Sequence, residues 1–394
     1  MRCKGAIFAV GMKTMTYDAV AAAKPRYDLL DGLRGVAAVL VIWYHFGEGF
    51  ATTAVDQMMN HGYLAVDFFF VLSGFVLGYA YDGRWKRGMS AGNFMLRRVI
   101  RLHPMVILSV FFGAIAFLIQ GSVKWDGTPV PLGHVLLSLL LALFLIPSHP
   151  MFTSEVRGNG EMFPLNGPSW SLFFEYIGSI LYAVWLHKLS TRALRAVVAV
   201  SGIGLALCAL YGNLSGGYSI GFGWSMATDG LGFVGGLCRL SFSFSMGLLL
   251  TRGFRRRNIA GAFWIASALI VAALACPYVG SPDGATPSYL NALYDLGCTF
   301  FLFPAVVYIG ACGVTTDAFS TRTCEFLGRL SYPVYIIHYP IMYLFYSWVW
   351  ANGLTFGEVW PVCVGLFLLI ICIAWAAMRF YDEPVRRWLT RRFI

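Results

Sequence analysis

The chain has 394 residues, of which 58% are hydrophobic and only 12% are charged, and its mean hydropathy is +0.68. Soluble domains carry about 25% charged residues, so this composition excludes a soluble globular protein. The formal net charge of +10 does not indicate nucleic-acid binding, because the basic residues form short clusters beside apolar runs. That pattern is typical of the topology signals of membrane proteins.

At the N-terminus, residues 1–26 are expected to form a cytoplasmic extension. Their short apolar run, GAIFAVGM, is not followed by a clear signal-peptide cleavage site. Apolar runs then follow at about 33–50, 61–81, 102–119, 132–147, 168–187, 194–211, 230–251, 259–280, 290–312, 326–350 and 358–380. Because a membrane-spanning helix needs about 20 residues, all but the short run at 132–147 are predicted to span.

The distribution of charge supports ten spans with both termini in the cytoplasm. If 132–147 does not cross, 26 of the 29 lysines and arginines lie in cytoplasmic segments. If it crosses, every later basic cluster falls outside, against the positive-inside rule. The sequence therefore predicts an all-α polytopic membrane helix bundle of about ten transmembrane helices. The segment 132–147 is predicted to be a re-entrant or interfacial helix.

No linker or internal repeat divides the chain, so we expect one membrane domain at 27–384 and a basic cytoplasmic tail at 385–394. The location expected for such a multi-pass protein is the cell's inner (plasma) membrane. The nine cysteines form no CxxC pair and no Cys/His metal-binding spacing, so no metal is expected.

Ionisable residues inside predicted spans are costly and often functional. They are His45, Asp67, Glu175, Arg239, Asp295 and His338. Arg239 could equally be a structural partner for a buried carboxylate, and hydration near a span end could explain Asp295. Counted from the predicted span ends at 1.5 Å per residue, the other four lie at nearly one depth, which favours a common site over four separate structural polar groups.

Two arginine patterns point to an anionic ligand at the cytoplasmic side. Arg34 and His45 are eleven residues apart, close to three helical turns, so they share a helix face about 16 Å apart. Arg98 and Arg101 lie on one helix face at the cytoplasmic start of the third predicted span. Their alternative interpretation is a positive-inside membrane anchor. Arginine can hold a phosphate, and histidine can act as a base near neutral pH.

Five segments together resemble the membrane acyltransferase family 3, whose members acylate extracytoplasmic glycans and other small acceptors. They are DGLRGVAAVLVIWYHF at 31–46, GYLAVDFFFVLSGF at 62–75, RRVIRLHP at 97–104, NGPSWSLFFEY at 166–176 and LGRLSYPVYIIHYPI at 327–341. The family's arginine and histidine motif residues correspond to Arg34 and His45, and its RxxR pair to Arg98 and Arg101. Its motif glutamate and second histidine correspond to Glu175 and His338.

The resemblance implies an enzyme that uses acyl-coenzyme A, expected to be acetyl-coenzyme A, to acylate a hydroxyl of a surface or exported glycan. Membrane lipid and polysaccharide biosynthesis proteins are its expected partners. His45 would then be the catalytic base, with Glu175 or Asp67 orienting its imidazole. Arg34, Arg98 and Arg101 would bind the donor's phosphates.

His338, with Ser331 or Tyr335, would hold the acceptor or the developing oxyanion. A covalent acyl-histidine intermediate remains open. The alternative function is a transporter in which the buried histidines and carboxylates form a relay. Against it, the sequence shows no repeat relating two halves.

Overall fold

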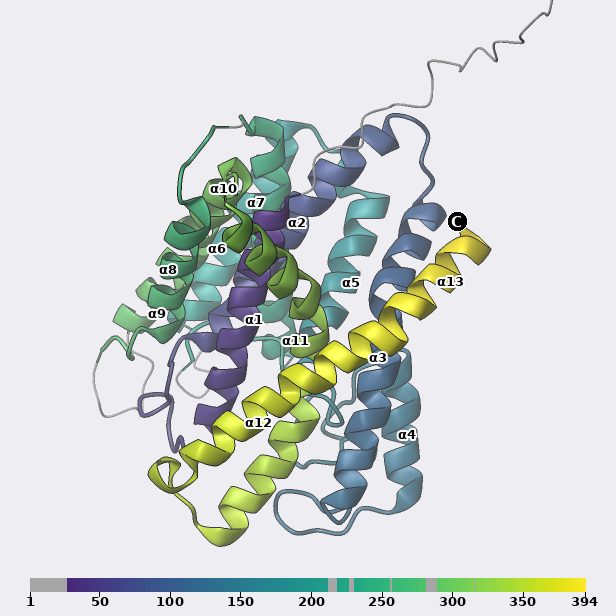
Figure 1. Cartoon of the computed structure of the whole chain (residues 1–394), viewed down its shortest axis with the longest axis vertical. Coiled ribbons are helices and arrows are strands. Elements are labelled where there is room, and N and C mark those ends of the chain that lie inside the picture. The colour runs from purple at the N-terminus through teal and green to yellow at the C-terminus, as the bar shows by residue number, and fades with distance from the viewer. Residues whose placement is uncertain (1–26, 212–217, 227–229, 256, 281–288, 316) are drawn as a thin grey trace, which may run out of the picture.

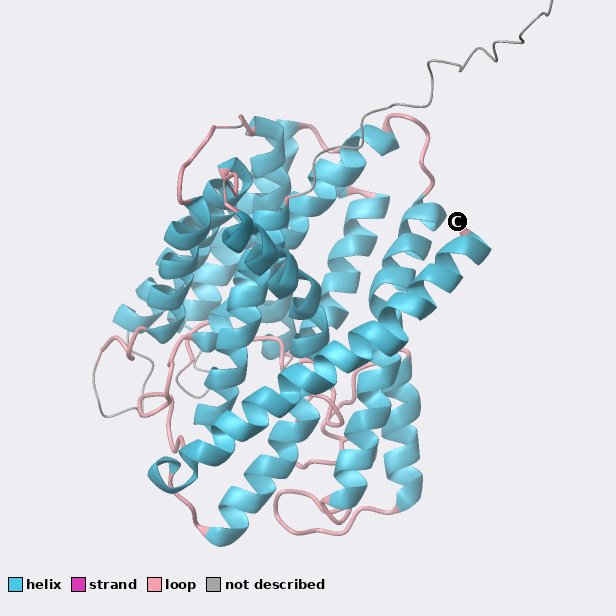
Figure 2. Ribbon diagram, in the orientation of Figure 1, coloured by secondary structure: helices cyan, strands magenta, loops and turns pink. Residues whose placement is uncertain are grey.

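The computed structural model describes residues 27–211, 218–226, 230–255, 257–280, 289–315 and 317–394, and the predicted extension at 1–26 lies outside them. The described part is an all-α bundle without a β-sheet (Figures 1 and 2). Its α-helices are α1 (Asp28–Glu48), α2 (Ala65–Trp85), α3 (Ala91–Ile119), α4 (Leu132–Leu143), α5 (Ser169–Val184), α6 (Thr191–Tyr211), α7 (Leu231–Gly253), α8 (Ala262–Ala275), α9 (Tyr289–Gly297), α10 (Phe303–Cys312), α11 (Ala318–Asn352), α12 (Phe356–Ala377) and α13 (Glu383–Phe393). This architecture confirms the predicted fold class of an all-α polytopic membrane helix bundle.

Within the described residues, seven helices are long and apolar enough to cross a membrane. They are α1, α2 with the turn before it, α3, α6, α7, α9 continued into α10, and α12 continued into α13. Every predicted apolar run forms a helix, and α5, α8 and α11 coincide with the three further predicted spans. The total of ten crossings remains a prediction.

The two short helices α4 and α5 lie one after the other along α3. Figure 1 shows α4 beside one half of α3 and α5 beside the other half. With 12 and 16 residues, each is shorter than the roughly 30 Å core of a bilayer at 1.5 Å per residue. The helix predicted at 132–147 is therefore α4, and the loop at 144–168 joins it to α5 inside the bundle.

A proline in α11 explains how this loop is held. Pro340 has no N–H, so the carbonyl four residues earlier, that of Ile336, loses its helical hydrogen bond. The side chain of Asn166, just before α5, donates a hydrogen bond to the Ile336 oxygen at 2.9 Å. The start of α5 and the middle of α11 therefore meet because Asn166 supplies the hydrogen-bond donor that the Ile336 carbonyl lacks.

The helices α1 and α11 cross in close contact because glycines lie at the crossing. A Cβ on Gly35 would lie 2.5 Å from the backbone oxygen of Leu327, and one on Gly328 would lie 2.7 Å from the Cβ of Asp31. Small residues allow such close approach between membrane helices. The crossing brings the LRG segment of α1 against the GRLS segment of α11, which sets the position of Arg34.

Candidate active site

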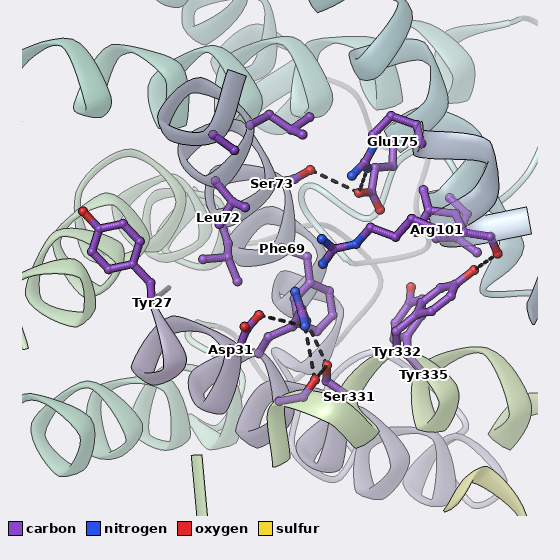
Figure 3. Close-up of a pocket in the computed structure, with 18 of the residues that line it drawn as sticks. Tyr27, Asp31, Phe69, Leu72, Ser73, Arg101, Glu175, Ser331, Tyr332 and Tyr335 are labelled. Atoms are coloured by element: carbon purple, nitrogen blue, oxygen red, sulfur yellow. Dashed lines mark hydrogen bonds and ion pairs between the residues drawn. The ribbon is translucent and has the colours of Figure 1, made fainter. Parts of the chain in front are cut away.

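Two cavities adjoin inside the bundle. The larger has a volume of about 1100 Å³, and we call it the basic cavity (Figure 3). The smaller has a volume of about 450 Å³ and contains His45 in its wall, so we call it the histidine cavity. Val66 of α2 and Tyr335 of α11 line both cavities, so the two spaces meet at these side chains.

The basic cavity has more arginines than carboxylates in its wall. Its arginines are Arg34, Arg84, Arg87, Arg98, Arg101, Arg329 and Arg386, and its carboxylates are Asp31, Glu175, Asp382 and Glu383. Each of the four carboxylates forms an ion pair with one of the arginines. Among the described residues, Arg84, Arg87 and Arg101 have no carboxylate within ion-pair distance. Figure 3 shows the Arg101 side chain reaching into the cavity. Three uncompensated cations make this cavity suited to a polyanionic ligand.

Arg34 is held in place by both helices of the glycine crossing. Its Nε donates to the Ser331 hydroxyl at 2.8 Å, and its guanidinium donates to the Gly328 oxygen at 3.2 Å. It also pairs with Asp31 at 3.0 Å. The predicted donor residue Arg34 therefore lines the basic cavity. Ser331, predicted at the acceptor or oxyanion, contacts Arg34 in that cavity.

Arg98 and Glu175 form an ion pair between α3 and α5. Arg98 also donates to the Ser179 hydroxyl at 3.2 Å, and Ser73 of α2 donates to the Glu175 carboxylate at 3.1 Å. Both charged groups line the basic cavity. The structure therefore places Glu175 beside the predicted donor arginines Arg98 and Arg101.

His45 has a carboxylate partner that the sequence analysis missed. The His45 Nδ1 lies 2.6 Å from an oxygen of Glu48, one turn later in α1, and Tyr346 donates to the same oxygen at 3.0 Å. This contact assigns the proton of the neutral imidazole to Nδ1 and leaves Nε2 with its lone pair free to accept a proton. Both His45 and Glu48 line the histidine cavity. Their spacing of three residues on a helix was a signal available in the sequence.

His338 stacks on His45. The two ring centroids are 5.2 Å apart with an angle of 28° between the planes. The His338 side chain is fully buried, and its Nδ1 lies 3.1 Å from the Val334 oxygen, one helical turn earlier. Its Nε2 has no hydrogen-bond partner within the described part of the chain. The structure therefore unites the two predicted histidines from α1 and α11.

Asp67 lies in a different cluster. Both of its oxygens accept hydrogen bonds from Arg239 of α7, at 3.1 and 2.6 Å. The pair is fully buried, and Arg239 also donates to the backbone oxygens of Phe222 and Tyr63. These contacts support the interpretation of Arg239 as a structural partner of a buried carboxylate. Asp295, for which hydration was offered as an explanation, is also fully buried and accepts a hydrogen bond from Tyr63 at 2.5 Å.

Tyr335 lies at the junction of the two cavities. Its hydroxyl is 2.7 Å from the Ser171 hydroxyl at the start of α5, and its ring packs edge-on against Phe69. Its ring centroid is 6.1 Å from that of His338. The predicted acceptor or oxyanion residue Tyr335 is thus near the histidine pair, whereas Ser331 lies with Arg34.

The four residues predicted at one depth therefore belong to three clusters. The prediction counted Glu175 inward from a span start at the outer surface. In the structure α5 begins partway along α3, after the loop at 144–168 has entered the bundle, so the first residue of α5 is not a valid starting point for the count. Depth counted along a helix is informative only if the helix starts at the membrane boundary.

Comparison with known proteins identifies the family of the chain. Residues 27–379 match the acyltransferase domain family, designated acyltransferase family 3. The chain is 24% identical over 386 residues to the peptidoglycan O-acetyltransferase OatA of Listeria monocytogenes, covering 91% of this chain and 55% of the relative. It is 26% identical over 390 residues to the acyltransferase MdmB of Streptomyces mycarofaciens, covering 93% of each. It is also 34% identical over 194 residues to protein 2 of the picA locus of Rhizobium radiobacter, covering 47% of this chain and 95% of the relative. No solved structure matches.

The chain spans about half the length of OatA, so the activity of that whole protein does not transfer directly. The family match covers most of the chain and includes all lining residues of the histidine cavity and all those of the basic cavity except Asp382, Glu383 and Arg386. The protein is therefore an integral membrane acyltransferase. More particularly, it belongs to acyltransferase family 3, and its relatives include a peptidoglycan O-acetyltransferase. This membership favours the enzyme over the transporter.

Proposed function

We propose that this protein transfers an acyl group, expected to be acetyl, from acyl-coenzyme A to a hydroxyl of a cell-surface or exported glycan. The observation that carries the proposal is the junction of the two cavities. On one side lie three arginines that have no carboxylate partner in the described part of the chain, and on the other lies the His45–Glu48 pair. A donor that is anionic at one end and reactive at the other fits this arrangement.

In the proposed reaction, His45 acts as a general base. Its Nε2 takes the proton of the acceptor hydroxyl as that oxygen attacks the thioester carbonyl. The tetrahedral intermediate collapses with cleavage of the carbon–sulfur bond, and the coenzyme A thiolate takes the proton back from His45. Glu48 holds the ring and stabilises the imidazolium through its 2.6 Å contact with Nδ1. The products are the acyl ester and free coenzyme A.

The donor is expected to lie along α1. Its phosphates would bind Arg101 and neighbouring arginines of the basic cavity, with charge-assisted hydrogen bonds. The eleven residues from Arg34 to His45 correspond to about 16 Å of helix, a distance that the extended pantetheine arm can cover. Its thioester would pass the junction at Tyr335 and Val66. The Tyr335 hydroxyl, which donates to Ser171 because the Ser171 proton goes to the Pro168 oxygen, would turn from Ser171 to the developing oxyanion.

The histidine cavity suits a sugar acceptor. Eleven tyrosine and tryptophan side chains contribute to its wall, namely Tyr44, Tyr63, Trp125, Trp170, Tyr218, Trp224, Tyr335, Tyr339, Tyr343, Tyr346 and Trp350. Aromatic rings offer flat surfaces for the C–H faces of a sugar ring, and tyrosine hydroxyls can bond its hydroxyl groups. The relative OatA is a peptidoglycan O-acetyltransferase, which supports the same acceptor class.

In the proposed orientation, the protein lies in the inner membrane with both termini and the basic cavity on the cytoplasmic side. The distribution of basic residues predicts this orientation. Cysteine labelling tests it on a background cleared of native thiols. A cysteine at Asn258, in the basic connection after α7, should be protected from an impermeant reagent in intact cells. Labelling from outside would contradict this orientation.

The decisive experiment uses proteoliposomes, labelled acetyl-coenzyme A and soluble peptidoglycan fragments. Wild-type protein should form a labelled ester and free coenzyme A without an ion gradient, and His45→Ala should form less than a tenth as much. His134→Ala, on α4 and outside both cavities, is the matched control and should retain activity. Equal ester formation by His45→Ala would exclude the proposed base. Movement of the acceptor without esterification would favour a transporter.

A further inference from the structure

The wall of the histidine cavity contains a second carboxylate, that of Glu161, which the proposed mechanism does not use. Glu161 lies in the loop between α4 and α5, and its residue surface is only 5% exposed. It lines the same cavity as His45 and Glu48. A carboxylate in a largely aromatic cavity is costly to bury unless it is paired or binds something.

The protein itself uses only part of the hydrogen-bonding capacity of Glu161. One oxygen accepts from the Asn159 amide at 2.7 Å, and the other accepts from the Tyr343 hydroxyl. A carboxylate has about four acceptor sites, so these two bonds leave room for ligand hydroxyls. Arg157 is close enough for its charge to act on Glu161, but within the described residues the two form no ion pair. Its guanidinium lies over the Tyr343 ring at 3.5 Å and donates to the Pro164 oxygen and to Gln120.

Two tyrosine rings separate Glu161 from the reaction centre. The Tyr339 ring lies 4.7 Å from the His45 ring and 4.7 Å from the Tyr343 ring, measured between centroids. Tyr343 in turn bonds Glu161. An acceptor that lies across Tyr339 with one hydroxyl at His45 would therefore extend toward Glu161.

The loop that carries Glu161 is firmly positioned. Arg157 is fully buried, and Glu155 accepts hydrogen bonds from the backbone N–H groups of Arg157 and Gly158. The backbone N–H of Met162 donates to the Trp224 oxygen at 3.0 Å. A carboxylate held this rigidly can select among hydroxyl patterns, because little conformational entropy is lost when the acceptor binds.

We infer that Glu161 is a specificity-determining residue of the acceptor site, which binds a hydroxyl of the acceptor other than the one that is acylated. The inference rests on the proposed function, since it assumes that the acceptor occupies the histidine cavity. The acceptor would then have several hydroxyl groups, and the carboxylate that selects it would lie in the loop between α4 and α5. A simple alcohol with a single hydroxyl would leave Glu161 unused.

Steady-state kinetics of Glu161→Gln test this inference, with acetyl-coenzyme A as donor and soluble peptidoglycan fragments as acceptor. Glutamine keeps an oxygen that can accept from Tyr343 but loses the charge. The acceptor KM should rise about tenfold, the difference between a charge-assisted and a neutral hydrogen bond, while the donor KM stays the same. Glu155→Gln is the matched control, because Glu155 is in the same loop, is similarly buried and does not line the cavity.

A double-mutant cycle separates acceptor binding from a structural role. Monodeoxy derivatives of an accepted sugar each remove one hydroxyl. For the hydroxyl that contacts Glu161, its removal and Glu161→Gln should each raise KM, but the two together should raise it no further. If all deoxy sugars add to the effect of Glu161→Gln, or if Glu155→Gln raises the acceptor KM as much as Glu161→Gln does, Glu161 only holds the loop. Absence of wild-type turnover would instead overturn the proposed function itself.

Discussion

Replacement of Glu48 tests the central contact of the candidate site. Glu48 is the last residue of α1, where the helix dipole disfavours a carboxylate, so its position is not explained by helix stability. Its contact with the His45 Nδ1 is short, at 2.6 Å, and only 14% of the His45 side chain is exposed. Such a charge-assisted bond contributes about 1.5–3 kcal/mol, against about 0.5–1.5 kcal/mol for a neutral one.

These magnitudes set the expected rates. Glu48→Gln keeps an acceptor for Nδ1–H but loses the charge, so kcat should fall roughly tenfold. Glu48→Ala also frees the ring to rotate, and kcat should fall about ten- to a hundredfold. Because Glu48 side-chain exposure is 28%, solvent screening favours the lower end of each range. His45→Ala should lose about 10²–10⁴-fold, the usual contribution of a general base.

The assay is release of the coenzyme A thiol together with ester formation at saturating donor and acceptor. Glu325→Gln provides the control, since Glu325 is an exposed carboxylate of α11 that lines neither cavity. The double variant at His45 and Glu48 should be no slower than His45→Ala, because the two residues act as one unit. If Glu48→Ala keeps more than half of the wild-type kcat while His45→Ala is inactive, the assignment of Glu48 is refuted.

Three further predictions follow from the other clusters. Arg101→Ala should raise the donor KM at least about tenfold with little change in the acceptor KM. The control is Arg192→Ala, which removes an exposed arginine of α6. An unchanged donor affinity would return Arg101 to the role of a membrane anchor. Asp67→Asn leaves Arg239 buried without its counter-charge and should cost about 3–5 kcal/mol, seen as a lower midpoint of thermal unfolding in detergent, whereas an unchanged midpoint would contradict a structural ion pair. Glu161 lies in a loop outside the membrane-spanning helices, and burial raises the pKa of its carboxyl to about 7. The carboxylate therefore becomes charged as the pH rises from about 6 to 8, and the acceptor KM of the wild type should fall over this range. The acceptor KM of Glu161→Gln should lack this step, and a step of equal size in that variant would assign the titration to another group.

The sequence alone determined the class of the protein and most of its elements. Apolar runs of about 20 residues and the clustering of lysine and arginine identify spanning helices, because the bilayer imposes both features locally. Spacing within one helix is equally local, so the shared face of Arg34 and His45 in α1 could be predicted. The same rule would have found Glu48, one turn after His45.

Tertiary structure decided which buried groups meet. Asp67, Glu175 and the two histidines all read as polar residues within spans, yet Asp67 pairs with Arg239, Glu175 with Arg98, and His45 with Glu48. Those partners come from different helices in two of the three cases, and their contacts depend on where each helix starts. The start of α5 is set by the loop at 144–168, which Asn166 fastens to the carbonyl freed by Pro340. The separation into a basic and a histidine cavity follows from that packing. The periodicity of a sequence predicts on which face of a helix a residue lies, but not which residue of another helix packs against it.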